Sequence, residues 1–336
     1  MSCFTISQGT GIFYLPLHFD LQLGGELLGA QVAFELSGPD DAPVVLVLGG
    51  ISAGRHITST ATDRSTGWWQ ELVGPGLAID TDRYRVLGID YLGGVGASTG
   101  PERGEGSQDF PLVTSLDQAR AIALLLEHLG IDELHRFVGS SYGGMVGMAF
   151  AVEFPDRLGG LVSIGAAHES HPMASAWRSL QRKIVALGVE AGDESSAVAL
   201  ARGLAMTTYR SHQEFAGRFA SEPSEVNGRV RLPVEDYLDA RGRDFATRFS
   251  AEEFLSLSQA IDLHRVDPEE IRVPTLLIGI TSDQLVPIQQ VAELASRLGE
   301  WGKLVQLPSL FGHDGFLKEV ATLTPILRDA LRGEVL

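Results

Sequence analysis

The sequence predicts one α/β unit, a mostly parallel, doubly wound sheet with a helical lid inserted into it. Three observations predict this fold. Short runs of Val, Ile and Leu bounded by glycine or proline recur, as in strands that are covered on both faces. Helical periods lie between these runs, and such alternation is typical of a parallel sheet. The alternation then stops in the middle of the chain and resumes later.

The apolar runs set the expected strands. Between two of them, Leu116, Ala119, Ala123 and Leu126 recur at helical spacing, and Gly130 stands where a glycine would end that helix. The expected strands cover residues 31–36, 44–50, 84–91, 135–140, 158–167, 275–280 and 303–309.

The middle segment, residues 168–271, contains no convincing strand. It is interpreted as a helical lid between two strands of one sheet, so that residues 1–167 and 272–336 form the core. The expected lid helices cover residues 174–187, 195–209, 212–220, 234–249 and 251–261.

Composition narrows the class of protein. The chain has 336 residues, is 44% hydrophobic and carries a formal charge of −17, which argues against binding nucleic acid or an anionic membrane surface. The single cysteine, Cys3, gives no disulfide framework and favours a reducing compartment. No signal peptide and no apolar stretch of membrane-spanning length is recognised, so we expect a cytoplasmic enzyme.

A candidate nucleophile stands in the stretch HRFVGSSYGGMVGMAF. The pattern G-x-S-x-G fits one frame, Gly139 to Gly143, with Ser141 at its centre. A sharp turn from strand to helix brings the residues on either side so close that glycine is favoured at both, and it exposes the serine hydroxyl. The alternative is a serine that merely caps the helix.

The two partners that a serine nucleophile needs stand after late strands. A serine needs a general base, which is itself oriented by a carboxylate. Asp283 follows the run TLLIGI and His313 follows KLVQLPS, in the order serine, acid, histidine that is typical of the α/β-hydrolase fold. Each could alone be an ordinary loop residue, but the agreement of all three favours a triad.

Two backbone N–H groups are expected to stabilise an oxyanion. One is that of Tyr142, after the nucleophile, and the other is that of Ile51, in the glycine-containing loop after the run VVLVL.

Other motifs do not predict a nucleotide, metal or nucleic-acid site. GGVGASTG does not have the spacing of a nucleotide loop, and His168 and His171 lack the spacing and third ligand of a metal site, so no metal and no bound cofactor are expected. The arginines of the lid are interpreted as a solvated face and not as a nucleic-acid site.

Several motifs together resemble the homoserine O-acyltransferases of methionine biosynthesis. They are GGISAGRH, the stretch at 97–101, GSSYGGM, TTYR, SDQLVP and GHDGF, and they extend from the first strands to the C-terminus. The resemblance implies transfer of an acyl group from an acyl-CoA co-substrate to the side-chain hydroxyl of an amino acid, through an acyl-serine. It also implies a homodimer formed through lid helices.

The resemblance also implies roles for single residues. Ser141, His313 and Asp283 would form the triad, and Tyr209 would contact the substrate. Arg210 would hold the substrate carboxylate and Asp314 its ammonium group, although Asp314 is also placed to cap a helix.

The acyl group is judged from three positions. Leu285 resembles acetyl-transferring relatives and favours acetyl over succinyl. Arg55, which departs from the family pattern, and Arg178 each offer a cation that would restore succinyl. Serine stays open as an acceptor because a pocket discriminates one methylene by only about 1–3 kcal/mol. A lidded esterase and a catalytically silent binding protein are the remaining alternatives.

Overall fold

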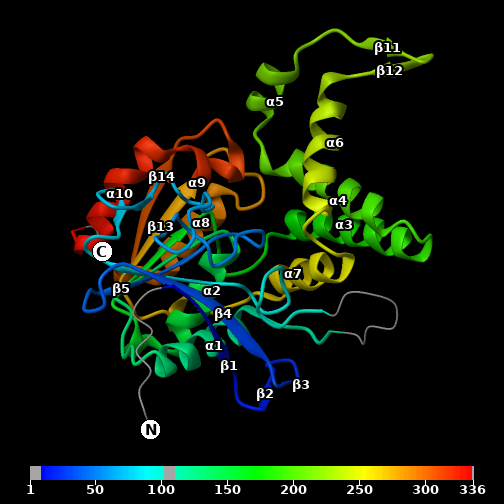
Figure 1. The fold of residues 1–336 in the computed structure, drawn as a ribbon. Coiled ribbons are helices and arrows are strands. Elements are labelled where there is room, and N and C mark those ends of the chain that lie inside the picture. The colour runs from blue at the N-terminus through cyan, green and yellow to red at the C-terminus, as the bar shows by residue number, and fades with distance from the viewer. Residues whose placement is uncertain (1–8, 102–109, 335–336) are drawn as a thin grey trace.

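An eight-stranded sheet runs through the centre of the described chain (Figure 1). The structure is a computed structural model that describes residues 9–101 and 110–334; Cys3 lies outside these residues. The strand order is β1-β4-β8-β5-β9-β10-β13-β14, parallel except where β4 pairs with β1 and β8. The strands are β1 (Gly9–Tyr14), β4 (Gln31–Ser37), β5 (Val44–Leu48), β8 (Arg85–Ile89), β9 (Arg136–Ser140), β10 (Leu161–Ile164), β13 (Thr275–Ile280) and β14 (Gly302–Leu307).

The seven expected strands and the doubly wound arrangement are confirmed. Alternate residues of β5 enter two different hydrophobic cores: Leu46 and Leu48 belong to one, Val45 and Val47 to the other. Both faces of the sheet are therefore covered, which explains the continuous apolar runs. The helices of the core are α1 (Ser115–His128), α2 (Tyr142–Glu153), α8 (Ile288–Leu298), α9 (Gly315–Lys318) and α10 (Val320–Arg332).

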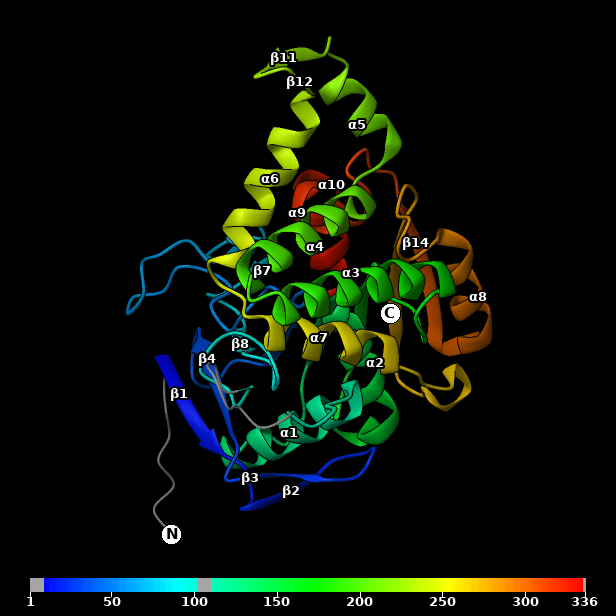
Figure 2. The ribbon, with the colours of Figure 1, turned by 90° about the vertical axis from the view of Figure 1, so that its right-hand side faces the viewer.

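The lid lies between β10 and β13, two neighbouring parallel strands of the sheet. Figure 2 shows α3, α4 and α7 stacked over one end of the core, with α5 and α6 extending away from it. The lid helices are α3 (Pro172–Glu190), α4 (Glu194–Tyr209), α5 (His212–Phe219), α6 (Pro233–Ala246) and α7 (Ala251–Leu263).

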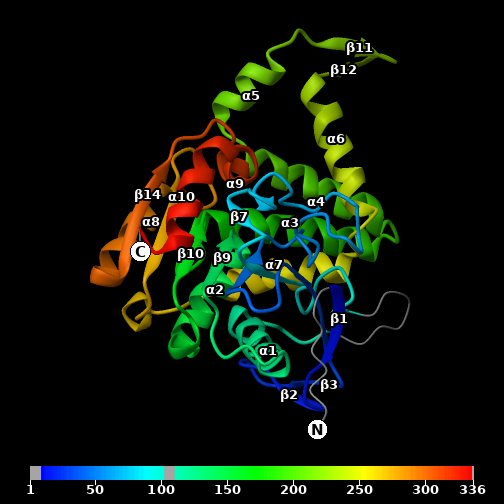
Figure 3. The ribbon, with the colours of Figure 1, turned by 60° about the vertical axis from the view of Figure 1, so that its left-hand side comes forward.

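The expectation of a lid without strands is wrong at one place. Strands β11 (Ser224–Val226) and β12 (Arg229–Arg231) form an antiparallel hairpin at the tip of the lid (Figure 3). The turn between them is Asn227-Gly228, and both residues have positive φ, 54° and 75°. An Asn-Gly pair is the strongest short-range signal of a hairpin, so the sequence did contain this feature.

Two further short strand pairs lie outside these elements. The chain also contains β2 (His18–Asp20) with β3 (Glu26–Leu28), and β6 (Val73–Gly74) with β7 (Ile79–Asp80), neither of which the apolar runs indicate. No helix in the described part of the chain is long and apolar enough to span a bilayer.

Candidate active site

Ser141 stands at a sharp junction between β9 and α2. Its backbone has a φ of 54° and a ψ of −122°, a conformation that side-chain-bearing residues rarely adopt. A Cβ on Gly139 would lie 2.3 Å from the carbonyl oxygen of Gly143, and a Cβ on Gly143 would lie 2.4 Å from that of Leu48. The two glycines are therefore required by close approach of backbone. The helix-cap interpretation does not hold, because the Ser141 side chain makes no capping hydrogen bond.

The structure brings the three predicted triad residues into one hydrogen-bonded chain. His313 Nε2 lies 2.8 Å from Ser141 Oγ, and His313 Nδ1 lies 2.6 Å from Asp283 Oδ2. Asp283 follows β13, and His313 lies in a short turn of helix, Gly312–Asp314, after β14. This geometry lets the imidazole accept the serine proton at one nitrogen while the carboxylate fixes the other.

The carboxylate of Asp283 is fully buried and held in place. Its Oδ1 accepts hydrogen bonds from the backbone N–H groups of Leu285, at 2.8 Å, and Val286, at 3.1 Å. Burial alone lowers the pKa of His313, but the charge and the hydrogen bond of Asp283 outweigh it, and the net effect is a raised pKa. The imidazole is thus a stronger base than a free histidine.

Two backbone donors border the serine, as expected for an oxyanion hole. Tyr142 begins α2, so its N–H has no acceptor within the helix. The loop with Ile51 lies alongside, since a Cβ on Gly50 would be 3.7 Å from Ser141 Oγ. Ile51 and Tyr142 both line the cavity that contains Ser141. The arrangement can place two N–H groups near a carbonyl oxygen bound at the serine.

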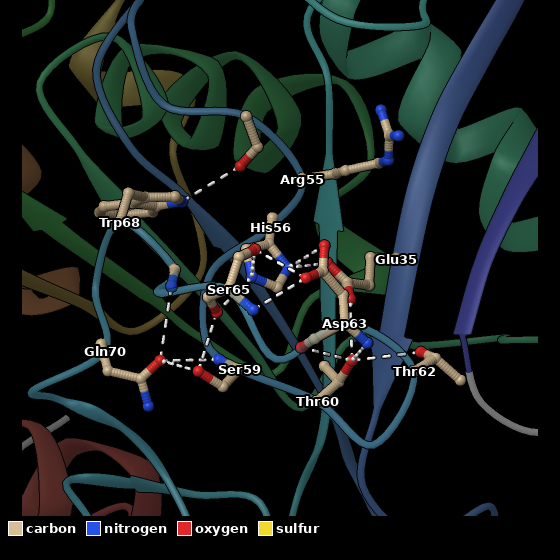
Figure 4. A network of polar contacts seen from close by, with 12 residues as sticks. Glu35, Arg55, His56, Ser59, Thr60, Thr62, Asp63, Ser65, Trp68 and Gln70 are labelled. Atoms are coloured by element: carbon tan, nitrogen blue, oxygen red, sulfur yellow. Dashed lines mark hydrogen bonds and ion pairs between the residues drawn. The ribbon is translucent and has the colours of Figure 1, made fainter.

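The loop that carries Ile51 is anchored by a polar network (Figure 4). His56 Nδ1 lies 2.9 Å from Glu35 Oε2 and His56 Nε2 lies 3.0 Å from the carbonyl oxygen of Ser65. Trp68 donates from Nε1 to the carbonyl oxygen of Gly54 at 3.1 Å. Burial lowers the pKa of His56, but these partners outweigh it and raise the pKa. The network fixes the backbone just beyond Ile51.

Three predicted substrate residues lie together beside the triad. The ring of Tyr209 lies 5.8 Å from that of His313, and both Tyr209 and Asp314 line the cavity. Asp314 Oδ2 lies 3.0 Å from Arg210 Nη2 and makes no side-chain capping bond to the helix that follows. The structure thus brings the expected anion and cation into direct contact with each other.

Arg210 is engaged by two carboxylates at the edge of the site. It is not among the residues that line the cavity, and its Nη1 also donates to Glu214 at 3.2 Å. Burial lowers the pKa of Arg210, but the neighbouring carboxylates of Asp314 and Glu214 outweigh burial, and the net effect is a raised pKa. Arg210 therefore contacts the cavity through its ion pair with Asp314.

A second arginine, Arg202, does line the cavity, although the lid arginines were expected to form a solvated face. The guanidinium carbon of Arg202 lies 4.9 Å from the ring centre of Tyr209 and 4.7 Å from that of Phe245. No ion pair joins Arg202 to a carboxylate within residues 9–101 and 110–334. Its place seven residues before Tyr209, on the same face of α4, is the sequence signal that was available.

The three acyl-specificity candidates lie in different places. Leu285 and Arg178 line the cavity with Ser141, whereas Arg55 does not. The Arg55 side chain forms an ion pair with Asp90, and its backbone N–H donates to the same carboxylate at 2.8 Å. Arg55 faces a separate surface depression, so it does not supply a cation to this cavity.

Comparison with known proteins agrees with this fold. A family model described as alpha/beta hydrolase fold matches residues 43–320. The structure of homoserine O-acetyltransferase from Bacillus anthracis is similar, with a TM-score of 0.88 and 21% identity over 97% of this chain and 98% of that one. The structure of esterase E22 is also similar, with a TM-score of 0.85 and 23% identity over 96% and 99%. At these identities the two structures show the fold alone.

Proteins related in sequence identify the family, which the similar structures do not. A homoserine O-succinyltransferase of Xanthomonas campestris is 46% identical over 90% of this chain and 79% of its own length. A serine O-succinyltransferase of Litchfieldella anticariensis is 34% identical over 94% and 96%. A homoserine O-acetyltransferase of Geotalea daltonii is 32% identical over 93% and 95%.

Proposed function

Because this chain belongs to the homoserine O-acyltransferase family of α/β hydrolases, we propose that it moves an acyl group from an acyl-CoA to the side-chain hydroxyl of L-homoserine. The observation that carries the proposal is the hydrogen-bonded chain from Ser141 through His313 to Asp283 within a lined cavity. The reaction would serve methionine biosynthesis, as in the family.

Ser141 and His313 account for every proton and every bond in the two half-reactions. His313 Nε2 takes the proton of Ser141 while Oγ attacks the thioester carbonyl carbon. The C–S bond breaks, coenzyme A leaves as a thiol with the proton from His313, and an acyl ester forms on Ser141. The homoserine hydroxyl then attacks that ester and gives its proton to His313, which returns it to Oγ. In both steps the N–H groups of Ile51 and Tyr142 would stabilise the oxyanion.

Homoserine needs a cation and an anion for its charged ends. Arg202 is proposed to bind its carboxylate, because it lines the cavity without a carboxylate partner in the described chain and two aromatic faces fix its guanidinium. Asp314 is proposed to bind its ammonium group, and Tyr209, whose ring lies next to both Arg202 and His313, to contact the substrate between these two residues. Arg210, the sequence-based candidate, would instead position Asp314.

Replacing Arg202 with leucine is expected to raise KM for homoserine about 30- to 100-fold, since a charged hydrogen bond to a desolvated carboxylate is lost. Burst release of coenzyme A in the first half-reaction should continue. Steady-state kinetics in both substrates measures this. An unchanged KM for homoserine in Arg202→Leu, with a raised one in Arg210→Leu, would return the role to Arg210.

For the donor we propose succinyl-CoA. The acetyl preference expected from Leu285 is not confirmed, and the alternative is supported by the relative at 46% identity, which is named a succinyltransferase. Relatives at 32–34% identity are named for both acyl groups. L-Serine stays the alternative acceptor, because one of these relatives is named for serine.

The test is mass spectrometry of the Ser141 peptide after the protein meets equal amounts of acetyl-CoA and succinyl-CoA, followed by addition of homoserine or serine. A succinyl adduct that homoserine discharges to an O-acyl amino acid supports the proposal. An esterase would instead release coenzyme A and free acid at a rate that neither amino acid changes. A protein whose Ser141 takes up neither acyl group would contradict acyl transfer altogether.

We further propose a cytoplasmic homodimer. Helices α5 and α6 and the β11–β12 hairpin project from the body in every view (Figures 1, 2 and 3). Val226, Val230 and Leu232 on this arm are exposed, although apolar side chains are normally buried. A second copy that covers the arm, as the family resemblance implies, would remove them from water.

A further inference from the structure

A cluster of charged side chains from two lid helices reaches the cavity through one member, Arg178. Arg178 and Arg182 stand one turn apart on α3, and both reach Asp262 on α7. Arg178 donates to Asp262 Oδ1 from Nε at 2.9 Å and from Nη2 at 2.6 Å, and Arg182 donates to Oδ2 from Nη1 at 2.7 Å. One carboxylate thus orients two guanidinium groups.

The cluster carries an excess positive charge where little water reaches it. The side chains of Arg178, Asp262 and Arg182 are 12%, 16% and 23% exposed. Burial alone raises the pKa of Asp262, but Arg178 and its hydrogen-bonding neighbours outweigh it and lower the pKa, so the carboxylate is charged. Two cations facing one anion leave one positive charge, which is costly in such a place unless an anion joins it.

Arg178 brings this charge to the reacting centre. It lines the cavity with Ser141 and His313, whereas Arg182 does not. Its charge also acts to lower the pKa of His313, against the larger effect of Asp283. Nη1 of Arg178 makes no hydrogen bond to any residue in the described parts of the chain. A guanidinium edge is therefore available to an anionic group in the cavity that contains Ser141.

Apolar side chains line another part of the cavity. Met145, Trp177 and Leu285 line the same cavity, and they suit methylene groups rather than a second polar end. An acyl group that fits both features has a carbonyl at Ser141, a short apolar middle and a carboxylate at the far end.

We propose that Arg178, held by Asp262, binds the distal carboxylate of a short dicarboxylic acyl group and so selects succinyl over acetyl donors. The inference rests on the proposed acyl transfer and names the residue that sets the donor. The carboxylate takes no part in bond making: the C–S bond of the thioester breaks and the Oγ–C bond of Ser141 forms as described above. An anion at Arg178 offsets the excess charge of the cluster.

The experiment compares Arg178→Leu, Arg178→Lys and Arg182→Leu with the unaltered protein. For each, kcat/KM is measured with succinyl-CoA and with acetyl-CoA at saturating homoserine, and thermal unfolding checks the fold. Arg178→Leu is expected to lower the succinyl-to-acetyl ratio about 100-fold, and Arg178→Lys to restore part of it. Arg182→Leu removes a cation from the same carboxylate but not from the cavity wall, so its ratio should fall at least tenfold less.

Four outcomes would overturn the inference. They are an unchanged ratio in Arg178→Leu, equal losses in Arg178→Leu and Arg182→Leu, no recovery in Arg178→Lys, and an acetyl preference in the unaltered protein. Failure of the proposed function itself would look different, because neither donor would then acylate Ser141 and no ratio would exist.

Discussion

Ser141→Ala is expected to lower coenzyme-A-dependent acyl transfer by about 10⁶-fold, the loss typical of removing a serine nucleophile. Alanine keeps the Cβ but removes the Oγ that lies 2.8 Å from His313 Nε2, so no acyl ester can form. Both the burst of coenzyme A and the acylated peptide should disappear. Rapid-mixing measurement of thiol release and mass spectrometry of the peptide check the two effects.

The same variant distinguishes covalent from direct transfer. If homoserine attacked the thioester directly, with His313 as base, Ser141→Ala would retain much of its transfer rate. A rate within tenfold of the unaltered protein would therefore contradict the acyl-serine mechanism. Thermal unfolding is the control: because Ser141 Oγ makes no helix-capping bond, the variant should fold normally.

The hydrogen-bonded arrangement of Ser141, His313 and Asp283 was predictable because each residue is marked by local sequence. The strained turn at Ser141 requires glycines at fixed spacing, and these can be recognised without a fold. Asp283 and His313 follow apolar runs that end at the same edge of the sheet, so chain order alone assigns them. Parallel strands convert positions along the sequence into positions in space.

The lid was less predictable because its contacts join separate helices. Arg210 stands in a recognisable motif, yet its ion pairs with Glu214 and Asp314 depend on how the lid packs on the core. Arg202 lies in an ordinary helical stretch, and only packing against Tyr209 and Phe245 directs it inward. A helix face can be deduced from periodicity, but the object that it faces cannot.

The direction of the Arg55 side chain is also set by a contact between residues that are far apart in the sequence. In sequence it stands four residues after Ile51, which suggested a cation near the acyl group. Asp90, at the end of β8, accepts both its backbone N–H and its side chain, and this directs the guanidinium to another depression. A carboxylate 35 residues away decided the direction of a side chain.

Asp283→Asn is expected to lower kcat by roughly 10⁴-fold, as an amide in place of a triad carboxylate does by holding the wrong histidine tautomer. Asparagine Oδ1 can still accept the N–H groups of Leu285 and Val286, at 2.8 and 3.1 Å in the present structure. That bonding turns the amide NH₂ toward His313 Nδ1, which must then be unprotonated. The proton moves to Nε2, the nitrogen that should accept the proton of Ser141.

The pH profile of the same variant gives a second, independent result. Transfer requires a neutral imidazole, so kcat/KM of the unaltered protein should fall as pH drops through the raised pKa of His313. In Asp283→Asn the carboxylate that raises this pKa is absent and burial still lowers it, so the acid limb should move to lower pH. An acid limb that stays in place would show that Asp283 does not set the basicity of His313.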